Sequence, residues 1–242
     1  MAKDTFKFKE FVVRHDRSSM RVGTDAVLLG AWAFTDLSAT NKDMCVLDIG
    51  CGCGLIALMI AQRFHSARVL GIDIDVPSVE EAMENVICCP FGERVRFQHA
   101  DVRQFALDEA SGKFDLIVCN PPYYTEDTLP PDVRRSKARN TSCLSFGELL
   151  VSVCRLLATE GRFSVIIPMQ VRNEFISEAL LKGLYLSREC RVYTVSGKAS
   201  KRVLLEFSFN QYVETVTTTL VLQDSSGKRS LDYAQLCKDF YL

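Results

Sequence analysis

The chain has 242 residues, and its 29 Lys and Arg residues nearly balance its 30 Asp and Glu residues, for a formal net charge of −1. Hydrophobic residues make up 48% and charged residues 24%, a composition that excludes a disordered chain, a coiled coil and a collagen-like fibre. The length favours one large domain with additions, because a single domain typically holds about 100–200 residues.

The ten cysteines are too few for a disulfide scaffold, in which they would exceed about 8–10% of the residues. They form no Cys-x-x-Cys pair and have no His-x3-His partner, so no metal site is expected. No apolar signal segment opens the sequence, and no apolar run reaches the roughly 18–20 residues that span a bilayer. We expect reduced thiols in a cytoplasmic protein without membrane contact, and a monomer, since no segment marks a subunit interface.

Short β-branched runs alternate with helical patterns from residue 44 onward. The expected strands are residues 44–49, 68–73, 95–100, 114–119 and 162–167, and the expected helices are residues 55–61, 76–88, 146–157 and 170–182. This alternation predicts an α/β fold with a Rossmann-like, doubly wound, mostly parallel sheet. The remaining runs, residues 185–195, 203–209 and 215–222, predict antiparallel strands added at one edge, followed by a short helix near 232–238.

Two details of these helices can be checked directly. We expect Glu80, Glu81 and Glu84 on the outer side of the helix at 76–88. Gly161 is expected to separate a helix from the strand at 162–167, and Gly183 to take the C-terminal glycine position after the helix at 170–182.

The first forty residues contain an alternating apolar segment, a polar turn and an apolar helix from Asp25 to Phe34. No linker separates them from the rest of the chain. We therefore expect a single domain made of an N-terminal cap (1–40), a catalytic core (41–210) and a C-terminal strand and helix (211–242).

A glycine-rich loop joins the first core strand to the following helix, with Asp48 before Gly50, Gly52 and Gly54. Glycines allow a sharp turn and a close approach of the backbone to a ligand. The third glycine comes one residue too early for the G-x-G-x-x-G dinucleotide fingerprint. Asp48 at the strand end would disfavour a pyrophosphate and suit a cation.

Acidic residues also follow the next two strands. Asp73 ends the second strand, where an acid accepts the hydroxyls of a ribose, and Asp101 follows the third, where it can accept from the amine of an adenine. One such Asp is more commonly a helix N-cap, but three of them beside a glycine loop favour a shared ligand crevice. Ile74, Val102 and Asn120 are expected in the same cofactor site. S-adenosylmethionine fits a ligand with adenosine, a positive charge and no pyrophosphate, and NAD fits poorly.

The most specific motif, Asn120-Pro121-Pro122-Tyr123, ends the fourth strand. The lone pair of an exocyclic amine or amide nitrogen is delocalised, so such a nitrogen is a poor nucleophile. The Asn120 side-chain oxygen and the Pro121 carbonyl can hold its two N–H groups, while the prolines stiffen the turn and Tyr123 stacks on a base. We predict that these four residues are catalytic and act mainly by orienting the nitrogen toward a sulfonium methyl group.

With these motifs, the chain resembles class I S-adenosylmethionine-dependent methyltransferases that carry N-P-P-Y, and within them the bacterial tRNA1(Val) adenine-N6-methyltransferases. The closer match rests on residues 15–17, 20–25, 46–58, 120–124 and 238–242. The resemblance implies that Gly23, Thr24 and Asp25 help to close the cofactor pocket and that the target is adenosine 37, beside the anticodon of tRNA1(Val). Cys53 departs from the Ser, Thr or Ala that is more common in such loops.

Because the net charge is close to zero, an RNA-binding surface must be a local patch. The candidates are Arg134, Arg135, Lys137 and Arg139 after the N-P-P-Y motif, and Lys198, Lys201 and Arg202 in the β-rich tail. Further cations lie in the N-terminal segment, at Lys7, Lys9, Arg14, Arg17 and Arg21. A run of charges is also commonly just a solvated face.

Three alternatives to an RNA methyltransferase remain open. A protein-glutamine N5-methyltransferase would use the same motif on an amide nitrogen, although such enzymes usually carry a helical N-terminal domain that forty residues do not provide. A module that binds the cofactor or RNA without catalysis would not need Asn120 and Tyr123. A nicotinamide oxidoreductase fits least, because of the glycine spacing and the lack of a Tyr-x3-Lys pair.

Overall fold

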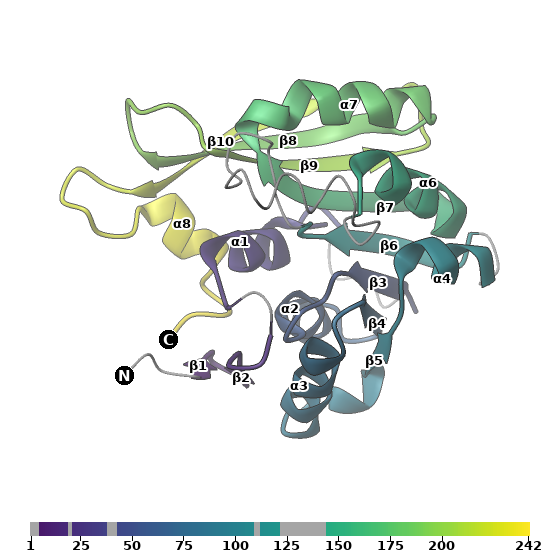
Figure 1. The fold of residues 1–242 in the computed structure, drawn as a ribbon. Coiled ribbons are helices and arrows are strands. Elements are labelled where there is room, and N and C mark those ends of the chain that lie inside the picture. Colours follow the sequence, from purple (N-terminus) through teal and green to yellow (C-terminus); the bar gives the residue numbers. More distant parts are fainter. Residues whose placement is uncertain (1–4, 19–20, 38–42, 109–111, 122–143) are drawn as a thin grey trace, which may run out of the picture.

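The computed structural model describes residues 5–18, 21–37, 43–108, 112–121 and 144–242. An eight-stranded sheet with the strand order β10-β8-β9-β7-β6-β3-β4-β5 forms its centre (Figure 1). The strands are β3 (Cys45–Ile49), β4 (Arg68–Asp73), β5 (Val95–His99), β6 (Phe114–Cys119), β7 (Leu157–Pro168), β8 (Tyr185–Val195), β9 (Arg202–Ser208) and β10 (Val216–Gln223). The predicted Rossmann-like, mostly parallel sheet is confirmed.

The edge that the sequence predicts to be antiparallel contains one reversed strand. Strand β9 runs antiparallel to both β7 and β8, whereas β10 pairs with β8 in parallel. This arrangement lets the chain pass from β9 over β8 to the sheet edge. Apolar patterning indicates that a segment is a strand, but strand direction depends on how the connections cross the sheet.

Helices cover both faces of the sheet (Figure 1). One face carries α1 (Thr24–Trp32), α2 (Leu55–Arg63) and α3 (Val76–Ile87), and the other carries α4 (Val102–Asp108), α6 (Phe146–Leu156) and α7 (Arg172–Leu181). The buried apolar side chains form two clusters, one on each face. Since side chains alternate along a strand, Val46 of β3 packs in the first cluster and Leu47 in the second.

The two ends of the chain pack together beside α2. A small antiparallel sheet pairs β1 (Thr5–Lys7) with β2 (Val12–Arg14), and α8 (Leu231–Leu236) follows β10. The backbone N–H of Lys9 donates to the Phe240 carbonyl at 2.9 Å, and the Phe8 ring stacks near Tyr241 at 6.1 Å between ring centroids. The predicted N-terminal cap and C-terminal segment are thus in contact with each other and with the first buried cluster.

Two boundary predictions have different outcomes. The φ of +79° at Gly183, directly after α7 and Lys182, agrees with the predicted C-terminal glycine. Gly161 does not separate a helix from a strand, because β7 already begins at Leu157 and runs through it. The pairing of β7 with β6 shifts register at this point. A Cβ on residue 161 would lie 2.7 Å from the Leu157 side chain, so a glycine is needed at this irregularity inside the strand.

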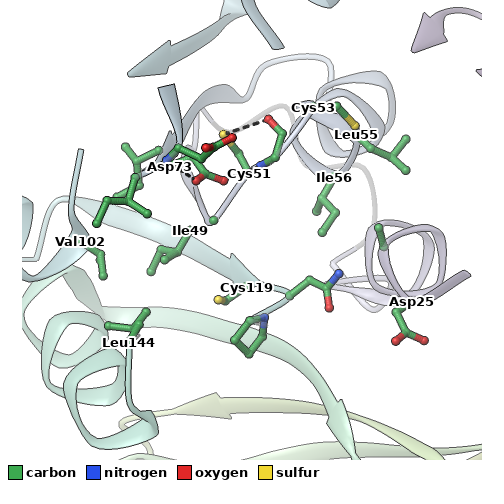
Figure 2. Close-up of a pocket in the computed structure, with 18 of the residues that line it drawn as sticks. Asp25, Ile49, Cys51, Cys53, Leu55, Ile56, Asp73, Val102, Cys119 and Leu144 are labelled. Atoms are coloured by element: carbon green, nitrogen blue, oxygen red, sulfur yellow. Dashed lines mark hydrogen bonds between the residues drawn. The ribbon is translucent and has the colours of Figure 1, made fainter. Parts of the chain in front are cut away.

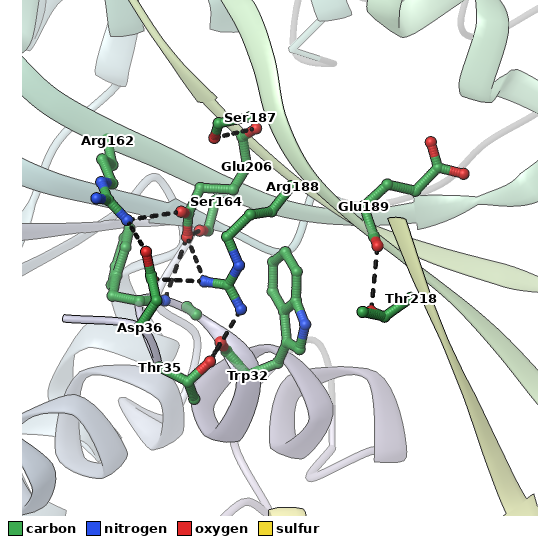
Figure 3. Close-up of polar contacts among 12 residues, drawn as sticks. Trp32, Thr35, Asp36, Arg162, Ser164, Ser187, Arg188, Glu189, Glu206 and Thr218 are labelled. Carbon is green, nitrogen blue, oxygen red and sulfur yellow. Dashed lines mark hydrogen bonds and ion pairs between the residues drawn. The ribbon is translucent and has the colours of Figure 1, made fainter. Parts of the chain in front are cut away.

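A buried polar cluster ties the C-terminal end of α1 to the sheet (Figure 3). Glu206 of β9 is fully buried, and it accepts from the Ser164 hydroxyl at 2.8 Å and from the Phe34 backbone N–H at 3.2 Å. Arg162 and Arg188 both bridge this carboxylate to Asp36. The cluster fixes the position of α1 on the sheet, and the first turn of α1 lines the cavity at the strand ends.

The order of the strands also determines where a ligand can bind. From β3 the chain moves outward through β4 to β5, and it then returns to the opposite side of β3 as β6. Doubly wound sheets bind ligands at the carboxyl ends of the strands where the order reverses in this way. The loops after β3 and β6 therefore meet at one crevice. None of the helices in the described part of the chain is long and apolar enough to cross a membrane.

Candidate active site

A cavity of about 620 Å³ opens at this switch point (Figure 2). It is lined by residues 21–26, 49–53, 72–75, 100–103 and 119–121, together with Leu55, Ile56 and Leu144. The walls thus come from the loops after β3, β4, β5 and β6 and from the first turn of α1. Most of the predicted cofactor residues meet here: Gly23, Thr24, Asp25, Gly50, Gly52, Asp73, Ile74, Asp101, Val102 and Asn120.

The glycine loop turns sharply at three positive φ angles, +70° at Gly50, +52° at Gly52 and +85° at Gly54. A Cβ built on Gly50 or Gly52 would meet nothing within 4 Å, so both glycines leave open space toward a ligand. Gly54 does not line the cavity. A Cβ there would lie 2.5 Å from the Phe97 ring, so this glycine allows α2 to approach the sheet closely.

Asp73 is oriented by backbone donors on both of its oxygens. Its Oδ2 accepts from the Gly52 N–H at 2.8 Å, and its Oδ1 accepts from the Asp75 N–H at 2.9 Å. A carboxylate has about four acceptor sites, so capacity remains for hydroxyl groups of a ligand in the cavity. With the open glycine loop and the apolar Ile74 and Val102 nearby, these residues fit the adenosine part of S-adenosylmethionine.

Asp48 differs from the prediction of direct ligand contact. It is fully buried on the α2 side of β3, does not line the cavity, and accepts from the Ala57 N–H of α2 at 3.1 Å. The other oxygen, Oδ1, has no hydrogen-bond partner among the described residues. Burial raises the pKa of Asp48 to about 7, and the nearby Asp73 charge acts in the same direction.

This raised pKa predicts how stability depends on pH. Between the ordinary pKa of 3.8 and about 7, the native state keeps a proton on Asp48 that the unfolded chain has released. The stabilisation is therefore present below pH 4 and is lost as the pH rises through 7, by up to about 4 kcal/mol for a shift of this size. Asp48→Asn removes the titrating group and keeps an acceptor for Ala57.

Urea unfolding of the variant and the wild type at several pH values measures this contribution. We expect the stability of Asp48→Asn relative to the wild type to increase from pH 4 to pH 8. A difference that stays constant with pH would show that Asp48 is ionised in the native state throughout this range.

Asp101 lines the cavity, and Arg103 holds its carboxylate. The Arg103 backbone N–H donates to Oδ1 at 2.9 Å, and the guanidinium Nε lies 3.0 Å from both carboxylate oxygens. The hydrogen bond from Arg103 lowers the pKa of Asp101, which keeps the carboxylate ionised and able only to accept. Arg103 is not among the site residues predicted from sequence, although an arginine two residues after a strand-end acid was a usable signal.

The first turn of α1 forms the wall opposite β4. Gly23 is the N-cap of α1, and Thr24 and Asp25 line the cavity. Asp25 is also ion-paired, because Arg202 Nε lies 2.8 Å from its carboxylate. In the structure Arg202 links β9 to α1, and its predicted contact with RNA stays a prediction.

Residues 16–18 of the N-terminal segment are held against α3, which also contacts the glycine loop. Glu81 is fully buried and accepts from the backbone N–H groups of Asp16, Arg17 and Ser18 at 2.9–3.0 Å. Asn85, one turn further along α3, donates to the Cys53 carbonyl of the glycine loop at 2.9 Å. The prediction that Glu81 lies on the outer side of the helix was therefore wrong.

The neighbouring glutamates do lie outside. Arg17 is paired with Glu84 at 2.6 Å and lies 3.9 Å from Glu80, and Arg14 lies 3.9 Å from Glu84. These two arginines, considered above as RNA contacts, are ion-paired to α3.

Asn120 follows β6 and closes the cavity on the side of β7. It is 7% exposed, and both Asn120 and Pro121 line the cavity next to Cys119. Pro122 and Tyr123 lie outside the described residues, as do Arg134, Arg135, Lys137 and Arg139. Of the remaining RNA candidates, Lys198 and Lys201 are exposed in the loop after β8.

The thiols near the cavity are not nucleophiles. Burial raises the pKa of Cys53 to about 12 and also raises the pKa of Cys51 and of Cys119. Because a thiolate is the reactive form, these side chains act as small apolar groups. No group of three or more His, Cys, Asp and Glu residues that could hold a metal ion occurs in the part of the chain described.

Comparison with known proteins agrees with this geometry. A family model described as a methyltransferase domain matches residues 40–207. A tRNA1(Val) (adenine(37)-N6)-methyltransferase of Bacteroides fragilis is 41% identical over 242 residues, which cover 100% of this chain and 99% of the relative. A protein of the same name from Vibrio campbellii is 39% identical over 237 residues, which cover 98% of this chain and 95% of the relative.

Among solved structures, a predicted O-methyltransferase from Agrobacterium tumefaciens superposes with a TM-score of 0.70 at 17% identity, covering 89% of this chain and 96% of that one. At this identity the similarity concerns the fold. The sequence relatives share nearly the whole length of the chain. The chain therefore belongs to the S-adenosylmethionine-dependent methyltransferases, in the family of the tRNA1(Val) (adenine(37)-N6)-methyltransferases.

Proposed function

We propose that this protein transfers a methyl group from S-adenosylmethionine to N6 of adenosine 37 in tRNA1(Val). One observation carries the proposal: Asn120 and Pro121, the described half of the N-P-P-Y motif, line the same cavity as the glycine loop and Asp73. A cofactor held by Asp73 would therefore share one enclosed space with a nitrogen held by Asn120. The names and full-length similarity of the relatives support the choice of the RNA substrate.

When bound, S-adenosylmethionine supplies an electrophilic methyl group on a positively charged sulfur. In the proposed site, Asp73 accepts the ribose hydroxyls and Asp101 accepts the adenine amine of the cofactor. Gly50 and Gly52 let the loop approach the remainder of the molecule. Gly23, Thr24 and Asp25 form the wall opposite β4 that separates the cavity from solvent.

The Asn120 side-chain oxygen and the Pro121 carbonyl accept the two N–H groups of the target amine. This orients the lone pair of the nitrogen out of the ring plane and toward the cofactor. Once methylated, the nitrogen is cationic and acidic, so its proton can leave to water without a strong base. Pro122 stiffens the turn, and Tyr123 stacks on the target base.

In this proposal the protein acts on tRNA in the cytoplasm as a monomer. Lys198 and Lys201 are exposed at the carboxyl ends of the strands, on the same side of the sheet as the cavity, and are proposed to contact tRNA phosphates. The four basic residues between 134 and 139 are proposed to contribute as well.

The test is transfer of a labelled methyl group from S-adenosylmethionine to total tRNA that lacks the modification. We expect label in tRNA1(Val), recovered as N6-methyladenosine after digestion to nucleosides. Unmethylated release-factor protein, which carries a glutamine substrate, is assayed in parallel. Label in the protein and none in RNA would reject the proposal in favour of the glutamine enzyme.

Asp73→Ala is expected to weaken cofactor binding about 10–100-fold, because it removes hydrogen bonds to a charged acceptor worth roughly 1.5–3 kcal/mol. The variant also leaves the Gly52 N–H without its acceptor. Calorimetric titration with S-adenosylhomocysteine measures the dissociation constant. Asp108→Ala, an exposed acid at the end of α4, is the control and should bind like the wild type.

A further inference from the structure

We propose that Arg103 is a positioning residue that makes the cofactor site specific for an adenine base, by holding the Asp101 carboxylate in a fixed orientation at the cavity. The inference rests on the proposed function only in placing the adenine of the cofactor next to Asp101. Arg103 lines the cavity and contacts Glu148 of α6. The transfer of the methyl group itself does not require it.

Three N–H groups of Arg103 hold Asp101. The backbone N–H donates to Oδ1, Nε lies 3.0 Å from both carboxylate oxygens, and Nη2 donates to Oδ2. A planar guanidinium that contacts both oxygens of a carboxylate determines its rotation as well as its position. A carboxylate has about four acceptor sites, so these three donors leave about one site for a ligand in the cavity that Asp101 lines.

Arg103 is itself anchored from a second element. Its Nη1 lies 3.3 Å from Glu148 Oε1 on α6. Glu148 belongs to a capping box, in which its Oε2 accepts from the Ser145 N–H at 2.9 Å and the Glu148 N–H donates to Ser145 Oγ at 3.2 Å. The orientation of Asp101 is thus set by the first turns of α4 and α6 together.

This arrangement has a consequence for specificity. An ionised carboxylate accepts a hydrogen bond from the 6-amino group of adenine and repels the 6-oxo group of hypoxanthine. The hydrogen bond from Arg103 lowers the pKa of Asp101, which prevents the carboxyl group from donating to that oxo group instead. Without Arg103, the side chain can rotate, and it can take up a proton more readily.

The experiment compares two ligands that differ at this one position, S-adenosylhomocysteine and S-inosylhomocysteine, by calorimetric titration of the full chain in the absence of RNA. We expect the wild type to bind the adenosyl ligand about 10–100-fold more tightly, because a site built for one hydrogen-bonding group rejects its replacement. Arg103→Ala should reduce the ratio to about threefold or less. Arg103→Lys should give an intermediate ratio, because an ammonium keeps the charge and loses the planar fork.

Arg155→Ala is the matched control, since Arg155 is an exposed arginine on α6 whose loss should leave the ratio unchanged. Equal weakening of both ligands in Arg103→Ala would overturn the inference and assign Arg103 a structural role. A higher ratio in that variant would overturn it too, because Arg103 would then contact the base directly. A wild type without preference would reject Asp101 as the adenine acceptor, while methyl transfer to tRNA would still test the proposed function separately.

Discussion

Asn120→Ala is expected to lower the rate of methyl transfer at saturating substrates by about 10²–10³-fold, the usual cost of removing one preorganised hydrogen-bonding group from an active site. The side chain is nearly buried at the end of β6 and faces the cavity. Without it the amine keeps one acceptor, the Pro121 carbonyl, and loses the orientation that directs its lone pair. Single-turnover transfer of labelled methyl groups to tRNA measures the effect.

Two further measurements separate orientation from a general loss of structure. The affinity for S-adenosylhomocysteine should change less than about threefold, since Asn120 is proposed to hold the target amine. Asn120→Asp keeps an acceptor oxygen at the same position and should retain much more activity than the alanine variant. Equal activity of the alanine variant and the wild type would exclude Asn120 from the chemistry.

Glu206→Ala is expected to destabilise the protein by about 3–5 kcal/mol, because it removes one partner from a buried ionic cluster. The carboxylate is fully buried between Arg162 and Arg188, which it bridges at 3.3 and 3.4 Å. Its loss leaves Asp36 as the one carboxylate paired with the two arginines among the described residues, and it removes the acceptor of the Phe34 backbone N–H. That amide belongs to a residue with a φ of +59°, so the end of α1 would also lose a constraint on its turn.

Glu206→Gln is the matched variant, since it preserves the shape and one acceptor oxygen. It should cost less than the alanine variant, and the difference between the two reports the part of the cluster that depends on charge. Urea denaturation followed by circular dichroism gives the free energy of unfolding of each. A loss below about 1 kcal/mol for Glu206→Ala would mean that the site relaxes and admits water.

The apolar runs predicted the elements around the site closely. The expected strands at 68–73 and 114–119 coincide with β4 and β6, and the expected helix at 76–88 differs from α3 by one residue. These segments are buried, and a buried strand or helix requires apolar residues that recur with the period of that structure. Helix α4 was not predicted, because its seven residues are too few to show a helical period.

Predictions from charge were less reliable. Glu81 has the sequence pattern of a surface residue, yet it is buried as the acceptor for the backbone of residues 16–18. Arg202 belongs to a basic run, yet it is paired with Asp25 across 177 residues. The local sequence does not reveal the partner of a charged side chain, since that partner comes from a distant element.

Within the site, local sequence predicted the groups at the strand ends: the glycine loop after β3, the acids after β4 and β5, and Asn120 after β6. In a parallel sheet the loops at these ends lie close together. Which of these groups line the cavity depends on the tertiary structure. Asp48 and Gly54 turned out to support the loop from behind, and Arg103 emerged as the partner of Asp101. The direction in which a side chain points, its burial and its ion pairs depend on contacts between distant elements, and no local sequence pattern encodes those contacts.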